Sequence, residues 1–143
     1  MSKAFVRIGF VGFVGILCVC VALAQTLVGR TGSAAGDDWQ SSWLDIKPSI
    51  TFKKSETLRL KVEGDAENVL VRLLPDQSDP TSPDGIEGGV RKVPADRVLV
   101  ITLTRDHPNV KQISVHAGRL AFDQSLGPKN GRARLTSVER GKK

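Results

Sequence analysis

Alternation of apolar and polar side chains in residues 97–117 constrains the fold of this chain more than any other feature. The run 97–104 reads Arg-Val-Leu-Val-Ile-Thr-Leu-Thr, and the run 110–117 reads Val-Lys-Gln-Ile-Ser-Val-His-Ala. Because successive side chains of a strand point to opposite faces, each run has one apolar face. Turn-forming residues at 105–109 separate the two runs, so the pattern predicts a β-hairpin whose first arm is a central strand.

The same alternation predicts strands elsewhere in the chain. Residues 57–63 and 69–74 form a second predicted hairpin. Residues 44–53 also alternate, but Pro48 has no N–H to donate, so we place that strand at a sheet edge. Shorter strands are expected at 90–93 and 132–138. The inward-facing residues predict the core, which comprises Ile46, Ile50, Phe52, Leu58, Leu60, Val62, Val69, Val71, Leu73, Leu99, Ile101, Leu103, Ile113, Val115, Leu120, Phe122 and Leu135.

About seven or eight short strands, with turns between them and no helical period after residue 24, predict an all-β fold. We expect a small antiparallel β-sandwich of the immunoglobulin-like type, with a small barrel as the alternative. Composition divides the rest of the chain into a flexible Gly-, Ser- and Thr-rich lead-in at 25–43, one domain at 44–139 and a basic tail at 140–143.

Residues 1–24 carry the pattern of a secretory signal peptide. Two basic residues precede an apolar run at 8–24 that ends in Ala22-Leu23-Ala24, a small-residue cleavage pattern. Cleavage would release a secreted or periplasmic chain of 119 residues that begins at Gln25. The alternative is an uncleaved membrane anchor at 8–24, because a helical run of this length reaches the short end of what spans a bilayer.

Both cysteines of the chain, Cys18 and Cys20, lie within this apolar run. A cleaved chain therefore contains no cysteine, so neither a disulfide nor thiol chemistry is available to it. Its stability must come from the hydrophobic core, in which each buried aliphatic or aromatic side chain contributes about 1.5–3 kcal/mol.

The chain lacks the motifs of the common catalytic and metal sites. It has no nucleophile elbow, no phosphate-binding glycine loop and no zinc-binding His-Glu-x-x-His, and we expect no cofactor. The two histidines are predicted to be solvent-exposed, His107 in a turn and His116 on the polar face of its strand. An enzyme is therefore the weakest of the function classes considered.

Two sets of residues are candidates for ligand binding. Residues 75–89 form a long loop rich in proline, glycine and acidic residues, which predicts a recognition surface for a cationic partner. Its carboxylates are Asp76, Asp79, Asp84 and Glu87, and because their spacing does not match a calcium-binding loop we expect no metal. Trp39 and Trp43 share one strand face and either form an aromatic platform for a ligand or cover one end of the core.

A third candidate set is basic and gathers near the C-terminus. Nineteen basic and fifteen acidic residues remain after residue 24, so the cleaved chain is only mildly basic. The cluster predicts at most weak contact with an anionic partner and no specific binding of nucleic acid. Its members are Arg132, Arg134, Arg140, Lys142 and Lys143.

These patterns favour an exported, non-enzymatic module that recognises a protein or a cell-envelope polymer through its loops. The alternative is a structural or assembly component that pairs through an exposed edge strand. A second alternative is an enzyme that uses the loop carboxylates. No pattern in the chain names the ligand or the oligomeric state.

Overall fold

The computed structural model describes residues 24–37, 39–76, 85–118 and 131–141, which form nine β-strands and no helix. One sheet contains β1 (Ala24–Thr26), β4 (Thr57–Glu63), β7 (Val98–Thr102) and β9 (Arg134–Gly141). The other contains β2 (Gly29–Ala35), β3 (Trp39–Phe52), β5 (Asn68–Leu74), β6 (Arg91–Lys92) and β8 (His107–Gly118). The all-β prediction is confirmed. Among the described residues, no helix long and apolar enough to cross a membrane occurs.

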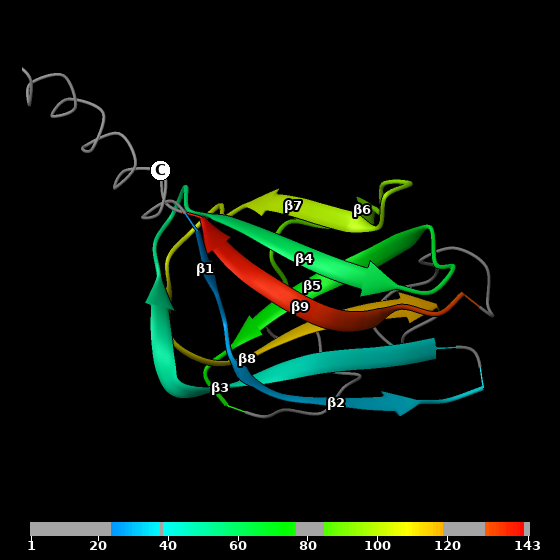
Figure 1. Ribbon diagram of the computed structural model, residues 1–143, viewed down its shortest axis with the longest axis horizontal. Coiled ribbons are helices and arrows are strands. Elements are labelled where there is room, and N and C mark those ends of the chain that lie inside the picture. The colour runs from blue at the N-terminus through cyan, green and yellow to red at the C-terminus, as the bar shows by residue number, and fades with distance from the viewer. Residues whose placement is uncertain (1–23, 38, 77–84, 119–130, 142–143) are drawn as a thin grey trace, which may run out of the picture.

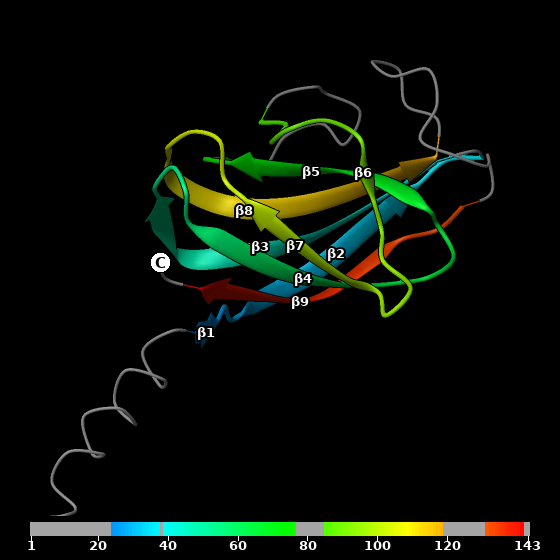
Figure 2. The same cartoon turned by 90° about the horizontal axis from the view of Figure 1, so that it is seen from above.

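The two sheets lie one above the other as two layers (Figures 1 and 2). All strand pairs are antiparallel, in the orders β1-β9-β4-β7 and β2-β3-β8-β5-β6. Among the described strands, only β2–β3 and β5–β6 are neighbours both in sequence and in space. Every other connection carries the chain from one sheet to the other.

Both predicted hairpins are wrong, although the strands themselves are present. In the first pair, β7 bonds to β4, whereas β8 lies between β3 and β5 in the other sheet. In the second pair, β4 and β5 also belong to different sheets, and β7 is an edge strand rather than a central one. Alternation identifies the buried face of a strand, but two strands can bury such faces by packing across the layers as well as by pairing side by side.

The core lies between the layers and confirms the inward-facing residues predicted from alternation. All the predicted residues within the described ranges are buried in one cluster, except Ile50, which is partly buried against it. Leu120 and Phe122 lie outside the described residues. The four-stranded sheet contributes Leu58, Leu60, Val62, Leu99, Ile101, Leu135 and Val138, and the five-stranded sheet contributes Leu44, Ile46, Phe52, Val69, Val71, Leu73, Val110, Ile113, Val115 and Ala117.

The strand that contains Pro48 is internal, not an edge as predicted. β3 pairs with β2 on one side as far as Ile46 and with β8 on the other. Pro48 lies beyond the last pair with β2, and between Asp45 and Ile50, where the register with β8 shifts. The missing N–H of proline therefore falls at an irregularity, where it removes no regular ladder bond.

The predicted flexible lead-in at 25–43 is also wrong, because it forms β1, β2 and the start of β3. Gly32 of β2 pairs directly with Trp43 of β3, and a Cβ atom on Gly32 would lie 2.5 Å from the indole Nε1. The indole therefore lies against the glycine backbone. Gly36 and Trp39 make the same kind of contact. An aromatic ring packed over a cross-strand glycine compensates for the side chain that glycine lacks.

Candidate functional site

The predicted acidic loop surface is only partly within the described residues. Asp79 and Asp84 lie outside them. Asp76 is exposed, and its Oδ1 lies 3.8 Å from Nζ of Lys111 in a solvated ion pair. These two side chains rim a hollow of about 640 Å³ beside Pro48. Of the four predicted carboxylates, Asp76 is therefore the one that the described structure places at the surface.

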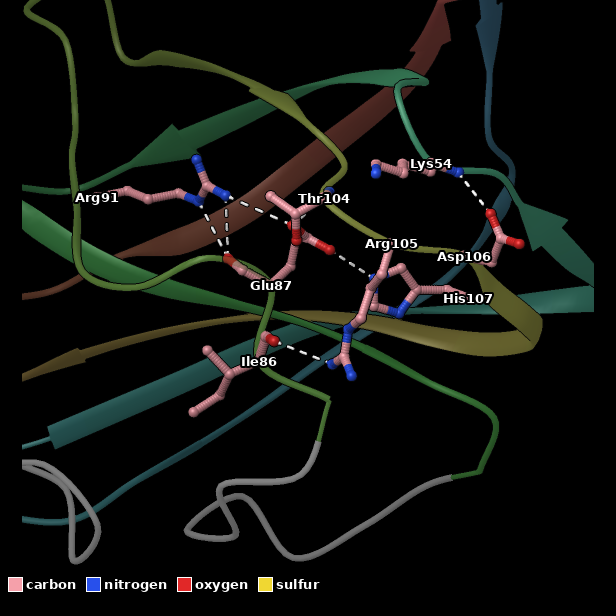
Figure 3. A network of polar contacts seen from close by, with 8 residues as sticks. All are labelled: Lys54, Ile86, Glu87, Arg91, Thr104, Arg105, Asp106 and His107. Carbon is pink, nitrogen blue, oxygen red and sulfur yellow. Dashed lines mark hydrogen bonds and ion pairs between the residues drawn. The ribbon is translucent and has the colours of Figure 1, made fainter.

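Glu87 is fully buried, so the prediction that it belongs to an acidic surface is wrong. Figure 3 shows its polar contacts. Its Oε1 lies 2.6 Å from Nε2 of His107, and its Oε2 accepts hydrogen bonds from the backbone N–H (2.9 Å) and hydroxyl (2.7 Å) of Thr104. Its own N–H donates to the carbonyl of Val71, and its carbonyl accepts from the guanidinium of Arg91. Glu87 thereby ties the end of the long loop to β5 and to the β7–β8 connection.

The surroundings of Glu87 favour its ionised form. Desolvation by burial acts to raise the pKa of Glu87, but the hydrogen bonds from Thr104 and His107 and the charge of His107 outweigh it, so the pKa lies below the usual 4.5. His107 itself is buried, which overturns the prediction of a solvated turn histidine. The loop ends on a structural latch, and these contacts leave the carboxylate of Glu87 no room for a ligand.

His116 is also buried, contrary to the prediction of a surface histidine. It lies on central strand β8, on the face turned away from the core cluster, between Ser41 of β3 and Leu70 of β5. Nη1 of buried Arg72 lies 3.0 Å from His116 Nε2, and Oγ of Ser114 lies 3.3 Å from the same nitrogen. The prediction placed His116 on the correct face but missed that this face is covered.

The charge state of His116 limits the chemistry available to this cluster. Desolvation by burial and the positive charge of Arg72 lower the pKa of His116 to about 3. Because a guanidinium can only donate hydrogen bonds, Nε2 acts as the acceptor and the neutral ring carries its proton on Nδ1. A histidine with so low a pKa is a weak base for activating Ser114 at neutral pH.

The two predicted aromatic candidates lie on the same outer face of the five-stranded sheet. Trp43 covers Gly32, while Trp39 covers Gly36 and packs with Leu70 and Ile86 in a small second cluster. Both indoles are half-buried. Neither indole covers an end of the core, which was one of the two predicted roles, because both lie on the face turned away from the core cluster. Their contacts with Gly32 and Gly36 instead hold β2 against β3.

Two of the predicted basic residues have acidic partners within the chain. Arg140 Nε lies 2.7 Å from Glu56 Oε1, and its guanidinium lies 4.9 Å from the ring centroid of Phe52. Arg134 makes one exposed contact of 3.0 Å with Glu63. The backbone of Arg140 belongs to β9, so it is not part of a tail. Arg132 lies just before β9 and is partly buried, whereas Lys142 and Lys143 lie outside the described residues.

Substitution of these two arginines should separate a structural ion pair from a surface one. We expect Arg140→Ala to lower the free energy of unfolding by about 1–2 kcal/mol, because it removes a two-point, largely buried contact and a cation–π contact. Arg134→Ala should cost less than about 0.5 kcal/mol, since both Arg134 and its partner Glu63 are solvated. Urea unfolding monitored by tryptophan fluorescence measures both values, and equal losses would contradict this assignment.

The unpaired side of β2 is the feature that the sequence prediction missed. Gly36 N–H donates to the carbonyl of Trp39 at 3.0 Å, so Gly36 faces β3. Backbone groups alternate in direction along an antiparallel strand. Those of Arg30, Gly32 and Ala34 therefore face β3, and those of Thr31, Ser33 and Ala35 face away from it. No described residue pairs with this outer side, and we call these three residues the β2 edge.

Among the described residues, the β2 edge has little of the usual protection of an edge strand. Its strand contains no proline and one charged residue, Arg30, and the three edge residues are exposed. Exposed edges of this kind accept further strands unless charge, proline or covering groups prevent it. The sequence signal was weak, because β2 consists of small residues without an apolar face; the turn formers that follow at Gly36-Asp37 were the only hairpin mark.

The β7 strand also lies at a sheet edge, but side chains bond to backbone N–H groups at its ends. Val62 N–H donates to Arg97 O and Leu103 N–H donates to Glu56 O, so the odd-numbered residues face β4 and Val98, Val100 and Thr102 face outward. The Val98 N–H is bonded to Asp96 Oδ1 at 3.0 Å. Just past the strand, the Thr104 N–H is bonded to Glu87 Oε2 at 2.9 Å. Carboxylates thus close this edge at both ends.

A groove borders the β2 edge on the side of the core. It has a volume of about 330 Å³ and lies between residues 31–33 of β2 and 134–136 of β9. Ser42 contributes its hydroxyl, which accepts a hydrogen bond of 3.0 Å from the Leu135 N–H. A strand added to β2 would therefore lie beside a polar groove.

Within the described ranges, no three His, Cys, Asp or Glu side chains lie close enough together to hold a metal ion. No family model matches the chain, and no curated protein or solved structure matches it either.

Proposed function

We propose that this chain is an exported, non-enzymatic β-sandwich module that binds another polypeptide by adding a strand to the β2 edge. One observation carries the proposal: a seven-residue border strand whose outward N–H and C=O groups have no partner among the described residues. An added strand gains affinity from main-chain hydrogen bonds, which this edge offers in register. This is the edge-pairing alternative of the sequence analysis, now assigned to β2.

Other functions have less support. The loop-recognition hypothesis loses Glu87, which is buried in the latch with Thr104 and His107. The enzyme hypothesis relied on the loop carboxylates, and the buried His116 with its pKa of about 3 is a poor substitute as a base. Neither alternative has a surface as open as the β2 edge.

The architecture that we infer is a sandwich of two antiparallel layers with a shared core. Its first described strand pairs with its last, and every connection except β2–β3 and β5–β6 crosses from one layer to the other. In immunoglobulin domains the strands follow a different order, so we favour a double-Greek-key jelly roll in which β2 is an additional strand.

Export is inferred from residues 1–24, whose structure lies outside the described residues apart from Ala24. Cleavage before Gln25 would fall at the start of the first strand, where Gln25 pairs with Arg140. Such a cut would remove the apolar segment and leave two of the three residues of β1 in place.

Selection from a displayed library of random peptides tests the proposed function. We expect the enriched peptides to be extended and rich in β-branched residues, because they must form a strand. Their affinity should fall about tenfold or more for Ser33→Pro, which removes an outward N–H, and should be unchanged for Val100→Pro, the matched change on the β7 edge. Both variants should keep the wild-type melting temperature within a few degrees, because neither N–H forms a bond inside the sheet. Binding that survives Ser33→Pro unchanged would overturn the proposal.

A further inference from the structure

We infer that the strand that occupies the β2 edge is β2 of a second copy of this chain, so that two five-stranded sheets join across a two-fold axis. This inference rests on the proposed function and names its partner. It follows from the residues of β2, whose spacing makes the edge complementary to itself.

The backbone supplies the first argument. When Gly32 lies on the two-fold axis, Thr31 of one subunit is opposite Ser33 of the other, and Gly29 is opposite Ala35. All of these residues have outward-facing backbone groups, so each opposed pair can exchange two hydrogen bonds. An antiparallel pair about a two-fold axis uses the same surface on both subunits, which is the commonest symmetry of homo-oligomers.

The side chains fit the same register. On the outer face, each Gly32 already lies under the indole of its own Trp43. With a glycine from each subunit at the axis, no side chain stands between the two strands on this face, and one indole lies on either side of the axis. Arg30, the single charge of the strand, is opposite Ala34 rather than the second Arg30, so no like charges are opposed.

On the inner face, small hydroxyl side chains of β2 can make polar contacts across the dimer interface. Because Gly32 points to the outer face with Trp43, its neighbours Thr31 and Ser33 point to the inner face, where both line the groove of about 330 Å³. In the dimer, the Thr31 hydroxyl of one subunit lies beside the Ser33 hydroxyl of the other, a favourable cross-strand pair. The partner strand would cover this groove.

A second copy fits better than an unrelated peptide. Strand addition obtains its specificity from pockets that receive alternate side chains of the added strand. β2 presents glycine, alanine, serine and threonine at most positions, which form no deep pocket for the side chains of an unrelated strand. The difference between the two edges agrees with this, because Asp96 and Glu87 bond backbone N–H groups at the two ends of the β7 edge, whereas no side chain of the described residues bonds the β2 edge.

Cysteine cross-linking of the exported protein tests the register. The background carries Cys18→Ser and Cys20→Ser, so that introduced cysteines are the only thiols whether or not the signal is cleaved. Thr31→Cys and Ser33→Cys chains are mixed and oxidised. Directly opposed residues lie about 5.5 Å apart between Cα atoms, within disulfide range, whereas like positions are diagonal and too far apart. We expect mixed Thr31→Cys/Ser33→Cys dimers to exceed both like dimers several-fold, and to exceed dimers from the control mixture of Val100→Cys and Thr102→Cys on β7.

Sedimentation equilibrium supplies the second measurement. One strand pair buries less surface than a stable interface, so we expect a dissociation constant in the range of about 1–100 μM. Ser33→Pro should make the chain monomeric, and Val100→Pro should leave the dimer intact.

The outcomes separate this inference from the proposed function. A monomer at all concentrations, or mixed cross-links no more abundant than in the β7 control, overturns the second-copy inference. If displayed peptides still bind and Ser33→Pro still abolishes that binding, the proposed strand addition stands with a foreign partner. If Ser33→Pro changes neither self-association nor peptide binding, both are overturned.

Discussion

Replacing Leu60 or Ile101 with alanine is expected to lower the free energy of unfolding by about 2–5 kcal/mol, because each side chain is buried between the two sheets. Leu60 is fully buried on β4 and Ile101 is 1 % exposed on β7. The cost combines the lost transfer of apolar carbon out of water with a cavity that the neighbouring strands cannot close. Urea unfolding of each variant measures the loss directly.

Arg59 provides the matched control within the same strand. It neighbours Leu60 but points outward, where its contact with Glu139 is 3.7 Å long and both side chains are about half exposed. Arg59→Ala should therefore change the free energy of unfolding by less than about 1 kcal/mol. A loss for Arg59→Ala as large as that for Leu60→Ala would show that the strand faces the other way.

The core-facing side of a strand could be predicted from sequence because it depends on local alternation. In β4, Leu58, Leu60 and Val62 must share a face whatever strand lies beside them. The same holds for Ile113 and Val115 of β8, and all five residues lie in the core cluster. Face assignment needs no knowledge of the partner strand.

Strand partners could not be predicted in the same way. β7 and β8 are consecutive and both amphipathic, which satisfies the local criteria for a hairpin. The structure instead pairs β7 with β4 and β8 with β3 and β5. Whether two consecutive strands pair in one sheet or lie in different sheets depends on contacts between residues far apart in the sequence. Alternation carries no information about those contacts.

The errors over His116 and Glu87 have a related cause. Polar residues on the outer face of a strand are exposed only if nothing packs over that face. Arg72, Ser114 and His116 lie on the outer face of the five-stranded sheet and are buried all the same. Glu87 was grouped with the loop acids by its position in the chain, but its partners Thr104 and His107 are 17 and 20 residues away.

β2 was missed because its stability does not come from its own residues. Glycine, serine and alanine have low strand propensity, so the segment looked like a linker. The indole of Trp43 packed on Gly32 supplies what the strand lacks. A strand whose apolar contacts are provided by its neighbour has no alternation of its own to detect. The same small residues leave the backbone groups of the β2 edge exposed.

Glu87→Gln is expected to lower the free energy of unfolding at pH 7 by about 1.5–3 kcal/mol, because the buried carboxylate accepts charge-assisted hydrogen bonds that a neutral amide replaces only in part. Asp76→Asn is the matched control, since Asp76 belongs to the same loop but is exposed, in a solvated ion pair with Lys111. Its cost should be below about 0.5 kcal/mol.

The pH dependence distinguishes the charge of Glu87 from its shape. The pKa of Glu87 is lower in the folded chain than its ordinary value of 4.5, so the carboxylate contributes stability that is fully present above that value. That contribution is lost as the pH falls below 4.5 and through the lower folded pKa, because Glu87 then becomes protonated in the folded chain as well as in the unfolded chain. The gap in unfolding free energy between wild type and Glu87→Gln should therefore be largest near neutral pH and should narrow progressively as the pH falls below 4.5. A gap that stays constant across this range would mean that the latch to Thr104 and His107 depends on the geometry of the side chain and not on its charge.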